Sequence, residues 1–246
     1  MVKICLNEES LAHVAAGIFV EQFKVAMTRS ESFNVVLSGG KTPLPTYELL
    51  TEDFFKDQID WRRVHVFFGD ERCVPAADSR SNFGTAHRHF LSRVPIPSQQ
   101  VYPMFRDQGS PEKLAIDYEN TIRLHFSGSP PSFDLVFLGL GDDGHTASLF
   151  PGSSALGERV RWVVPIQKPK EDFARLTMTL PILNLTQMAL FLVTGQDKAE
   201  ILKKVLANSE PSQPLPAQLI RPIEGSSLWL ADSSAAQLVD TAKENL

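Results

Sequence analysis

The sequence predicts an α/β fold in which a mostly parallel sheet carries helices on both faces. Segments with helical and with strand periodicity alternate along the chain, which is the pattern of such folds. Several strand-length segments are almost continuously apolar, as strands are when helices cover both faces of a sheet. With 246 residues, of which 43% are hydrophobic, the chain can bury a large core, and we expect residues 1–246 to form a single domain.

The first predicted helix follows Ser10, which we expect to be its N-cap. Apolar residues recur after it at helical spacing and indicate a buried stripe: Leu11, Val14, Ala15, Ile18, Phe19 and Phe23. Strands are then predicted at 33–37, 64–68, 133–138, 162–166, 176–180, 188–194 and 228–231. Further helices are predicted at 43–51, 81–93, 111–126 and 198–207. The proline-containing stretches are expected to be surface connections, and they are 95–103, 127–131 and 210–216.

A glycine-containing loop follows the strand predicted at 33–37 and precedes a helix that Pro43 opens. Proline is favoured at the first position of a helix, and the free N–H groups at a helix N-terminus favour anions. The loop is therefore a candidate phosphate-binding loop, although glycines at a strand end are commonly only part of a turn. Its glycines are adjacent, so it matches neither the P-loop nor the dinucleotide-binding pattern. The candidate residues are Ser38, Gly39, Gly40, Lys41 and Thr42.

Charged residues follow the next predicted strand, 64–68, directly after Gly69. Taken alone, the run of Asp70, Glu71 and Arg72 is typical of a solvated loop, whose ion pairs contribute little to stability. Beside other strand ends of the same kind, it supplies a carboxylate and a guanidinium. Guanidinium groups suit planar or phosphate-like anions.

The strand predicted at 133–138 leads into a glycine-rich segment that contains Asp142, Asp143 and His145. In open α/β sheets ligands gather at the carboxyl ends of the strands, so we expect His145 at the rim of a site. An imidazole is suited to proton transfer near neutral pH. Three other interpretations are a plain turn, a surface histidine, and a divalent-metal site made by the two aspartates and the histidine.

Composition narrows the possible partners. The formal charge is −5, and no cluster of Lys and Arg is interleaved with aromatic residues, so we expect no nucleic-acid partner. No apolar segment approaches the ~20 residues of a membrane span, and we expect neither a membrane association nor a signal peptide. Cys5 and Cys73 are too few for a disulfide framework, which favours free thiols and a cytoplasmic location. His87 and His89 point to different faces of a predicted helix, so we expect no metal site there.

Four motifs, in this order along the chain, resemble those of the 6-phosphogluconolactonase family. They are the segment 38–43, the segment 69–72 with Val74, Pro75, Ser81 and Asn82, the segment 138–152, and the segment 175–181 with Asn184. The set is far more specific than any one of its members. The resemblance implies a three-layer, Rossmann-like fold of the deaminase/lactonase superfamily. It also implies hydrolysis of 6-phospho-D-glucono-1,5-lactone to 6-phosphogluconate in the oxidative pentose phosphate pathway.

The glucosamine-6-phosphate deaminases of the same superfamily are the main alternative. Their pattern has a tyrosine where this chain has Arg72, and a glutamate five residues after the histidine, where this chain has Phe150. Pro151 and Gly152 keep the two patterns in register. Isomerisation and deamination need several proton transfers, which an apolar side chain cannot carry. A noncatalytic sugar-phosphate sensor is a third interpretation, but it gives the segment around His145 no use.

On the matching positions, the resemblance implies a mechanism without metal or cofactor. His145 takes a proton from the attacking water and returns it to the ring oxygen of the lactone. Asp143 holds the imidazole while Asp70 orients the water or the sugar hydroxyls, or the two aspartates have each other's role. Arg72 or the backbone N–H groups of residues 39–41 stabilise the developing negative charge.

The resemblance also implies how the substrate is held. The 6-phosphate binds to the loop 38–42, to Arg175 and to Lys198, and Arg72 also contacts the substrate. Taken alone, Arg175 and Lys198 are typical surface charges. The only partner that we expect from the sequence is the small sugar-phosphate lactone, and the oligomeric state stays open.

Overall fold

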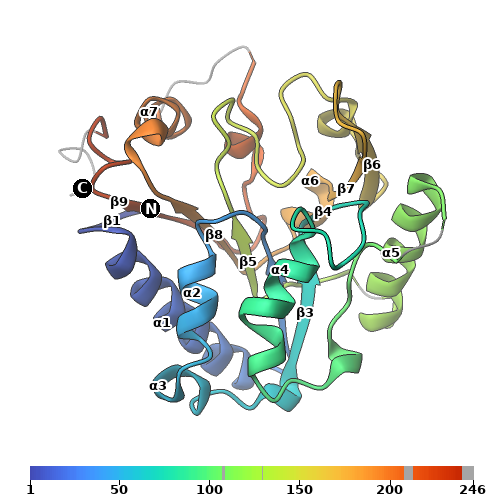
Figure 1. Ribbon diagram of the computed structural model, residues 1–246, viewed down its shortest axis with the longest axis horizontal. Helices are drawn as coiled ribbons and strands as arrows, with labels where there is room; N and C mark the ends of the chain where they lie inside the picture. Colours follow the sequence, from blue (N-terminus) through green and yellow to red (C-terminus); the bar gives the residue numbers. More distant parts are fainter. Residues whose placement is uncertain (107–108, 129, 208–212, 240–246) are drawn as a thin grey trace.

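The computed structural model describes residues 1–106, 109–128, 130–207 and 213–239, and it contains two sheets (Figure 1). The larger sheet is parallel, with the strand order β1-β9-β8-β5-β2-β3. Its strands are β1 (Val2–Cys5), β2 (Phe33–Leu37), β3 (Val64–Phe68), β5 (Leu135–Leu138), β8 (Met188–Val193) and β9 (Ser226–Asp232). The smaller sheet is antiparallel, with the order β4-β7-β6. Its strands are β4 (Asp70–Arg72), β6 (Val163–Gln167) and β7 (Ala174–Met178).

Seven α-helices connect the strands in the described part of the chain. They are α1 (Glu8–Met27), α2 (Leu44–Leu49), α3 (Asp53–Lys56), α4 (Asn82–His89), α5 (Pro111–His125), α6 (Leu180–Leu183) and α7 (Ala199–Leu206). None of these helices has both the length and the apolar composition that crossing a bilayer requires. The predicted connections 127–131 and 210–216 lie partly outside the described residues.

The N-cap of α1 differs from the prediction, which placed it at Ser10. Asn7 is the N-cap, because its Oδ1 accepts the backbone N–H of Ser10 at 2.8 Å. Ser10 Oγ in turn accepts the N–H of Asn7 at 3.0 Å. The two residues form a capping box, so the helix begins three residues earlier than the apolar stripe suggested.

Helices cover both faces of the parallel sheet, as predicted. On one face, Phe19 of α1 packs edge to face on Phe33 of β2, with ring centroids 5.2 Å apart. On the other face, His125 at the end of α5 packs on Phe67 of β3 at 5.2 Å, and Phe126 packs on the same ring at 6.4 Å. The prediction of a three-layer α/β fold is confirmed.

The strands predicted at 162–166 and 176–180 do not join the parallel sheet. They correspond to β6 and β7, which pair with each other and form the small sheet with β4. The second also ends earlier than predicted, because Leu180 begins α6 and Pro181 occupies its first turn. β4 is polar and only three residues long, so its sequence is typical of a loop, and pairing with β7 makes it a strand.

The order of the parallel strands reverses between β2 and β5. From β2 the chain continues to β3 on one side, and from β5 it continues to β8 on the other side. Such a switch point leaves a crevice at the carboxyl ends of the two strands. The loop 38–43 and the segment 139–145 both leave the sheet at this crevice.

A half-buried polar cluster on the α5 face carries two histidines. His125 Nε2 lies 2.6 Å from Asn34 Oδ1, and the hydroxyl of Tyr102 lies 3.4 Å from His125 Nδ1 and 3.2 Å from His65 Nδ1. Burial lowers the pKa of His125 to about 4, and the neighbouring His65 adds to this effect. Burial also lowers the pKa of His65.

We expect these histidines to make the free energy of unfolding fall as the pH drops from about 7 to 5. The unfolded chain takes up protons at the ordinary histidine value of about 6.5, whereas the folded protein keeps His125 neutral until about pH 4, so acid favours unfolding across this window. Urea unfolding at the two pH values measures the effect. His125→Gln should weaken the pH dependence, and the exposed control His87→Gln should not. Equal pH dependence in wild type and His125→Gln contradicts the prediction.

Candidate active site

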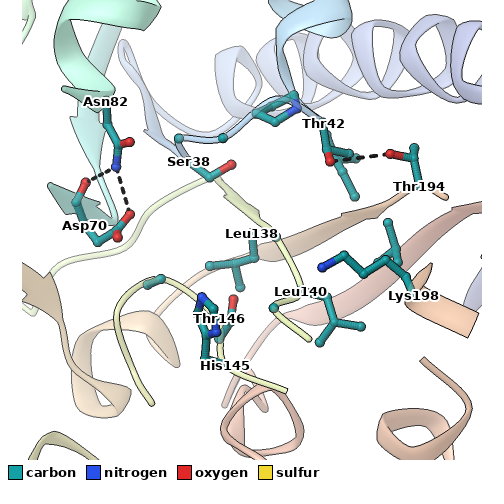
Figure 2. A pocket seen from close by; sticks show the side chains of 18 of the residues that line it. Ser38, Thr42, Asp70, Asn82, Leu138, Leu140, His145, Thr146, Thr194 and Lys198 are labelled. Atoms are coloured by element: carbon teal, nitrogen blue, oxygen red, sulfur yellow. Dashed lines mark hydrogen bonds between the residues drawn. The ribbon is translucent and has the colours of Figure 1, made fainter. Parts of the chain in front are cut away.

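A cavity of about 280 Å³ lies at the switch point and collects residues from all the predicted site segments (Figure 2). Lys41 and Asp143 are the predicted site residues that do not line it. The side chain of Lys41 is exposed, and Asp143 contacts the site through His145. The predicted residues that do line the cavity are Ser38, Gly39, Gly40, Thr42, Asp70, Arg72, His145, Arg175 and Lys198.

The imidazole of His145 faces the cavity and is held by Asp143. Asp143 Oδ1 lies 2.6 Å from His145 Nδ1 and also accepts the backbone N–H of His145 at 3.0 Å. Burial favours a higher pKa for the Asp143 carboxyl, but the hydrogen bonds from His145 outweigh it and hold that pKa below its ordinary value. The ionised carboxylate therefore accepts a hydrogen bond from Nδ1–H, which keeps the proton on Nδ1 and leaves Nε2 as the basic nitrogen.

The loop around His145 needs its glycines. A Cβ atom on Gly141 would lie 2.0 Å from His145 Nδ1, so only glycine lets the ring lie over this part of the backbone. Gly144 has a φ of +82°, a conformation that residues with a side chain rarely adopt. Ala147 has a φ of +49°, which is strained for a residue other than glycine. The interpretation of this segment as a turn and its interpretation as a catalytic segment are thus compatible, because the turn places the imidazole of His145 at the cavity.

Phe150 packs directly on the imidazole of His145, with ring centroids 4.6 Å apart. Two cations approach the same aromatic ring: Lys168 Nζ lies 4.7 Å and Arg175 Cζ 5.7 Å from its centroid. The position at which the deaminase pattern has a glutamate is therefore an apolar contact of His145 in this chain, and it supplies no proton-transfer group.

Asp70 is almost buried, with 7% of its surface exposed, and two side chains fix its carboxylate. Ser148 Oγ donates to Oδ2 at 2.7 Å. Asn82 Nδ2 donates to Oδ1 at 3.1 Å and to the backbone oxygen of Asp70 at 2.9 Å. Neither donor was predicted from the sequence, where Asn82 was only a member of a motif and Ser148 had no assigned role. Their signal was their position within two matching segments.

Glu71 organises the polypeptide beside the cavity, a role that the sequence analysis also missed. The residue is buried, with 1% of its surface exposed. Oε1 accepts the N–H groups of Arg72 and Asn82 at 2.7 Å each, and Oε2 accepts the N–H of Phe83 at 2.8 Å and the hydroxyl of Ser81 at 3.1 Å. Burial raises the pKa of the Glu71 carboxyl, although the hydrogen bonds oppose this shift. Glu71 thus ties the start of α4 to β4.

Arg72 and Arg175 are direct partners across the small sheet. Two nitrogens of Arg175 donate to the two carboxylate oxygens of Glu171, at 2.7 Å each. Arg72 Nη1 donates to the backbone oxygen of Arg80 at 2.6 Å, and its buried Nε has no hydrogen-bond partner among the described residues. The guanidinium of Arg72 therefore has more N–H groups free to bind an anion than that of Arg175.

Lys198 lies at the opposite side of the cavity from Asp70, close to Thr42 and Thr194 (Figure 2). The two threonine hydroxyls are 3.4 Å apart. Lys198 Nζ donates to Asp142, which is largely exposed. Asp142 and Asp143 thus have different partners, Lys198 and His145. The described residues contain no group of three or more His, Cys, Asp or Glu that could hold a metal ion.

The comparisons with known proteins agree with one another. The family model described as glucosamine-6-phosphate isomerases/6-phosphogluconolactonase matches residues 6–229. The 6-phosphogluconolactonase of Bos taurus is 43% identical over 244 residues, which cover 97% of this chain and 93% of that protein. The crystal structure of 6-phosphogluconolactonase from Thermotoga maritima has a TM-score of 0.78 and 31% identity, covering 94% of this chain and 100% of that one. A monomeric glucosamine-6-phosphate deaminase also has a TM-score of 0.78, with 96% of this chain and 99% of that one covered, but at 21% identity the likeness concerns the fold alone.

Proposed function

The chain belongs to the family of glucosamine-6-phosphate isomerases and 6-phosphogluconolactonases, and on that premise we propose that it hydrolyses 6-phospho-D-glucono-1,5-lactone to 6-phosphogluconate. It is a hydrolase that opens the ester bond of a lactone. The observation that carries this conclusion is the imidazole of His145, which faces the cavity while Asp143 occupies its other ring nitrogen. The apolar contact of Phe150 with the same ring disfavours deamination.

His145 acts first as a base and then as an acid. Nε2 takes a proton from a water molecule while the water oxygen forms a bond to C1 of the lactone. The carbonyl electrons move to the oxygen of C1, and a tetrahedral intermediate results. When it collapses, the bond between C1 and the ring oxygen breaks, and the imidazolium returns its proton to that oxygen. Asp143 stabilises the imidazolium between the two transfers.

Asp70 and Arg72, both on β4 of the small sheet, contact the reacting atoms. The Asp70 carboxylate, which lines the cavity, aligns the attacking water or the sugar hydroxyls. The guanidinium of Arg72, together with backbone N–H groups of residues 39–41, stabilises the negative charge that develops on the carbonyl oxygen. Each well-aimed donor of this kind lowers the barrier by roughly 3 kcal/mol.

The 6-phosphate binds at the side of the cavity that carries Lys198, Thr42 and the glycine loop 38–42. Arg175, which lines the cavity from β7 beside Arg72, adds a cation from the side of the small sheet. Gly40 has a φ of +90°, which allows the loop to turn sharply there. Since the formal charge of the chain is −5, the anion is held by these local cations and not by the overall charge.

Residues 1–246 work as one domain, and the free thiols of Cys5 and Cys73 support a cytoplasmic location.

We expect Lys198→Ala and Arg175→Ala to raise KM by about 10- to 100-fold while kcat changes little, because a phosphate contact is made equally before and during the reaction. Initial rates at varied lactone concentration measure both constants. Lys203→Ala, at an exposed position of α7, is the control and should leave KM unchanged. A fall in kcat at constant KM would place these cations at the reacting carbonyl and not at the phosphate.

The function is tested with freshly prepared 6-phosphoglucono-δ-lactone and, separately, with glucosamine 6-phosphate. Acid release from the lactone is followed and corrected for spontaneous ring opening. We expect turnover of the lactone and no release of ammonia from the amino sugar. Ammonia release without lactone hydrolysis would identify a deaminase, and binding of 6-phosphogluconate without either reaction would identify a sugar-phosphate sensor.

A further inference from the structure

Asn82 stands beside the cavity, but the reaction steps described above give its side chain no role. Its backbone N–H donates to Glu71 at 2.7 Å, and the preceding Ser81 caps α4 by accepting the N–H of Gly84 at 2.9 Å. These backbone contacts place Asn82 at the first position of α4 whatever its side chain does. Asn82 is buried, with 4% of its surface exposed, and it lines the cavity.

The amide of Asn82 lies between Asp70 and the glycine loop. Nδ2 makes two hydrogen bonds to Asp70, one to its carboxylate and one to its backbone oxygen (Figure 2). Because the amide nitrogen must face the carboxylate, Oδ1 faces the loop. A Cβ atom on Gly39 would lie 1.8 Å from this oxygen, so a glycine at that position is what allows the amide to enter. Three segments meet at this one side chain: β4, α4 and the loop after β2.

Ser148 fixes the other oxygen of the same carboxylate. Its hydroxyl donates to Asp70 Oδ2 at 2.7 Å, and its backbone N–H donates to Thr177 Oγ1 at 3.2 Å. Ser148 belongs to the loop of His145, whereas Asn82 belongs to α4. A carboxylate held at both oxygens by buried donors from different segments cannot rotate about its terminal bond, and its orientation relative to the His145 loop is fixed.

We propose that Asn82 is a positioning residue that acts through Asp70, setting the orientation of this carboxylate relative to the glycine loop and to His145. The proposal rests on the proposed function, because it assigns Asp70 to the reacting centre. It also explains why a primary amide occupies the position: the side chain must donate to a carboxylate on one side and place a small, uncharged oxygen against Gly39 on the other.

The test compares Asn82→Asp with Asn82→Ala. In Asn82→Asp the shape is kept, but at about pH 8 two carboxylates face each other and the donor is lost; at about pH 5.5 the pair shares a proton, which restores a hydrogen bond to Asp70. We expect kcat of both variants at pH 8 to fall by about 10- to 100-fold, since small errors of orientation are costly. Relative to wild type at the same pH, the rate of Asn82→Asp should then recover several-fold on acidification, and that of Asn82→Ala should not.

Dividing the rate of each variant by the wild-type rate at the same pH isolates the effect of the carboxylate pair formed by Asp70 and the aspartate in Asn82→Asp. The charged groups around it are Glu71 and Arg72 on β4 and Arg175 on β7, and these, like His145, are the same in both variants. Asn120→Asp adds the same charge at an exposed position of α5, and it should follow the wild type at every pH. Thermal unfolding of each variant shows whether α4 is intact.

Three outcomes overturn the proposal. One is wild-type kcat in both variants. Another is a ratio that does not change with pH in Asn82→Asp, and the third is a loss of rate in both variants that parallels a loss of thermal stability. If the wild-type protein itself does not open the lactone, the proposed function fails instead, and the two failures are therefore distinguishable.

Discussion

Replacing His145 with alanine is expected to lower kcat by about 10²- to 10⁴-fold and to leave KM nearly unchanged. The substitution removes the group that we propose as general base and acid, and it leaves the contacts to the phosphate in place. The imidazole lines the cavity, and its partner Asp143 sits outside it. Rates with 6-phosphoglucono-δ-lactone, corrected for spontaneous opening, give the measurement. The residual rate reflects substrate binding and charge stabilisation alone.

Asp143→Asn and His87→Ala complete this experiment. An asparagine in place of Asp143 no longer stabilises the imidazolium and permits the other tautomer, so we expect a smaller loss of kcat than in His145→Ala, and also with KM preserved. His87→Ala removes an exposed histidine and should have no effect. A His145→Ala protein that opens the lactone at the wild-type rate would remove the assignment of His145 as the base.

The second large effect is expected at Glu71, where alanine should lower the free energy of unfolding by about 3–5 kcal/mol, since several buried donors lose their acceptor together. Three backbone N–H groups and one hydroxyl converge on this carboxylate. Because two of them belong to Arg72 and Asn82, kcat should fall as well. Urea unfolding measures the stability, and it is done at neutral pH to keep carboxylates ionised.

Glu71→Gln and Glu21→Ala are the matched variants for this prediction. Glutamine keeps one oxygen acceptor but turns an amide N–H₂ toward donors, so the loss of stability should lie between those of wild type and Glu71→Ala. Glu21 is exposed on α1, and its replacement should change stability by less than about 0.5 kcal/mol. Wild-type stability in Glu71→Ala would mean that water replaces the carboxylate and that the loop after β4 is not anchored by it.

The sequence alone predicted the α/β class, the buried parallel strands and the glycine-rich turns at their ends, because each of these is encoded within a few neighbouring residues. Apolar runs indicated β2, β3 and β5, and the motif around His145 indicated the candidate base and the aspartate two residues before it. The same local rules failed at the N-cap of α1, where a capping box placed the cap at Asn7 and not at Ser10. They also failed at the start of α6, where Pro181 lies in the first turn of a helix.

What the tertiary structure decided is which distant residues meet. Asp70, Glu71 and Arg72 are typical of a solvated loop until β7 pairs with them, about a hundred residues further along the chain. That pairing sets Arg72 beside Arg175 and buries Glu71 under the start of α4, and the fold then brings Ser148 and Asn82 onto one carboxylate. Hydrogen bonds between segments far apart in sequence depend on strand order and on the pairing of the two sheets, neither of which is encoded in the local periodicity of the residues. The sequence therefore determined the kinds of groups at each strand end, and the packing of the two sheets determined which of them act together.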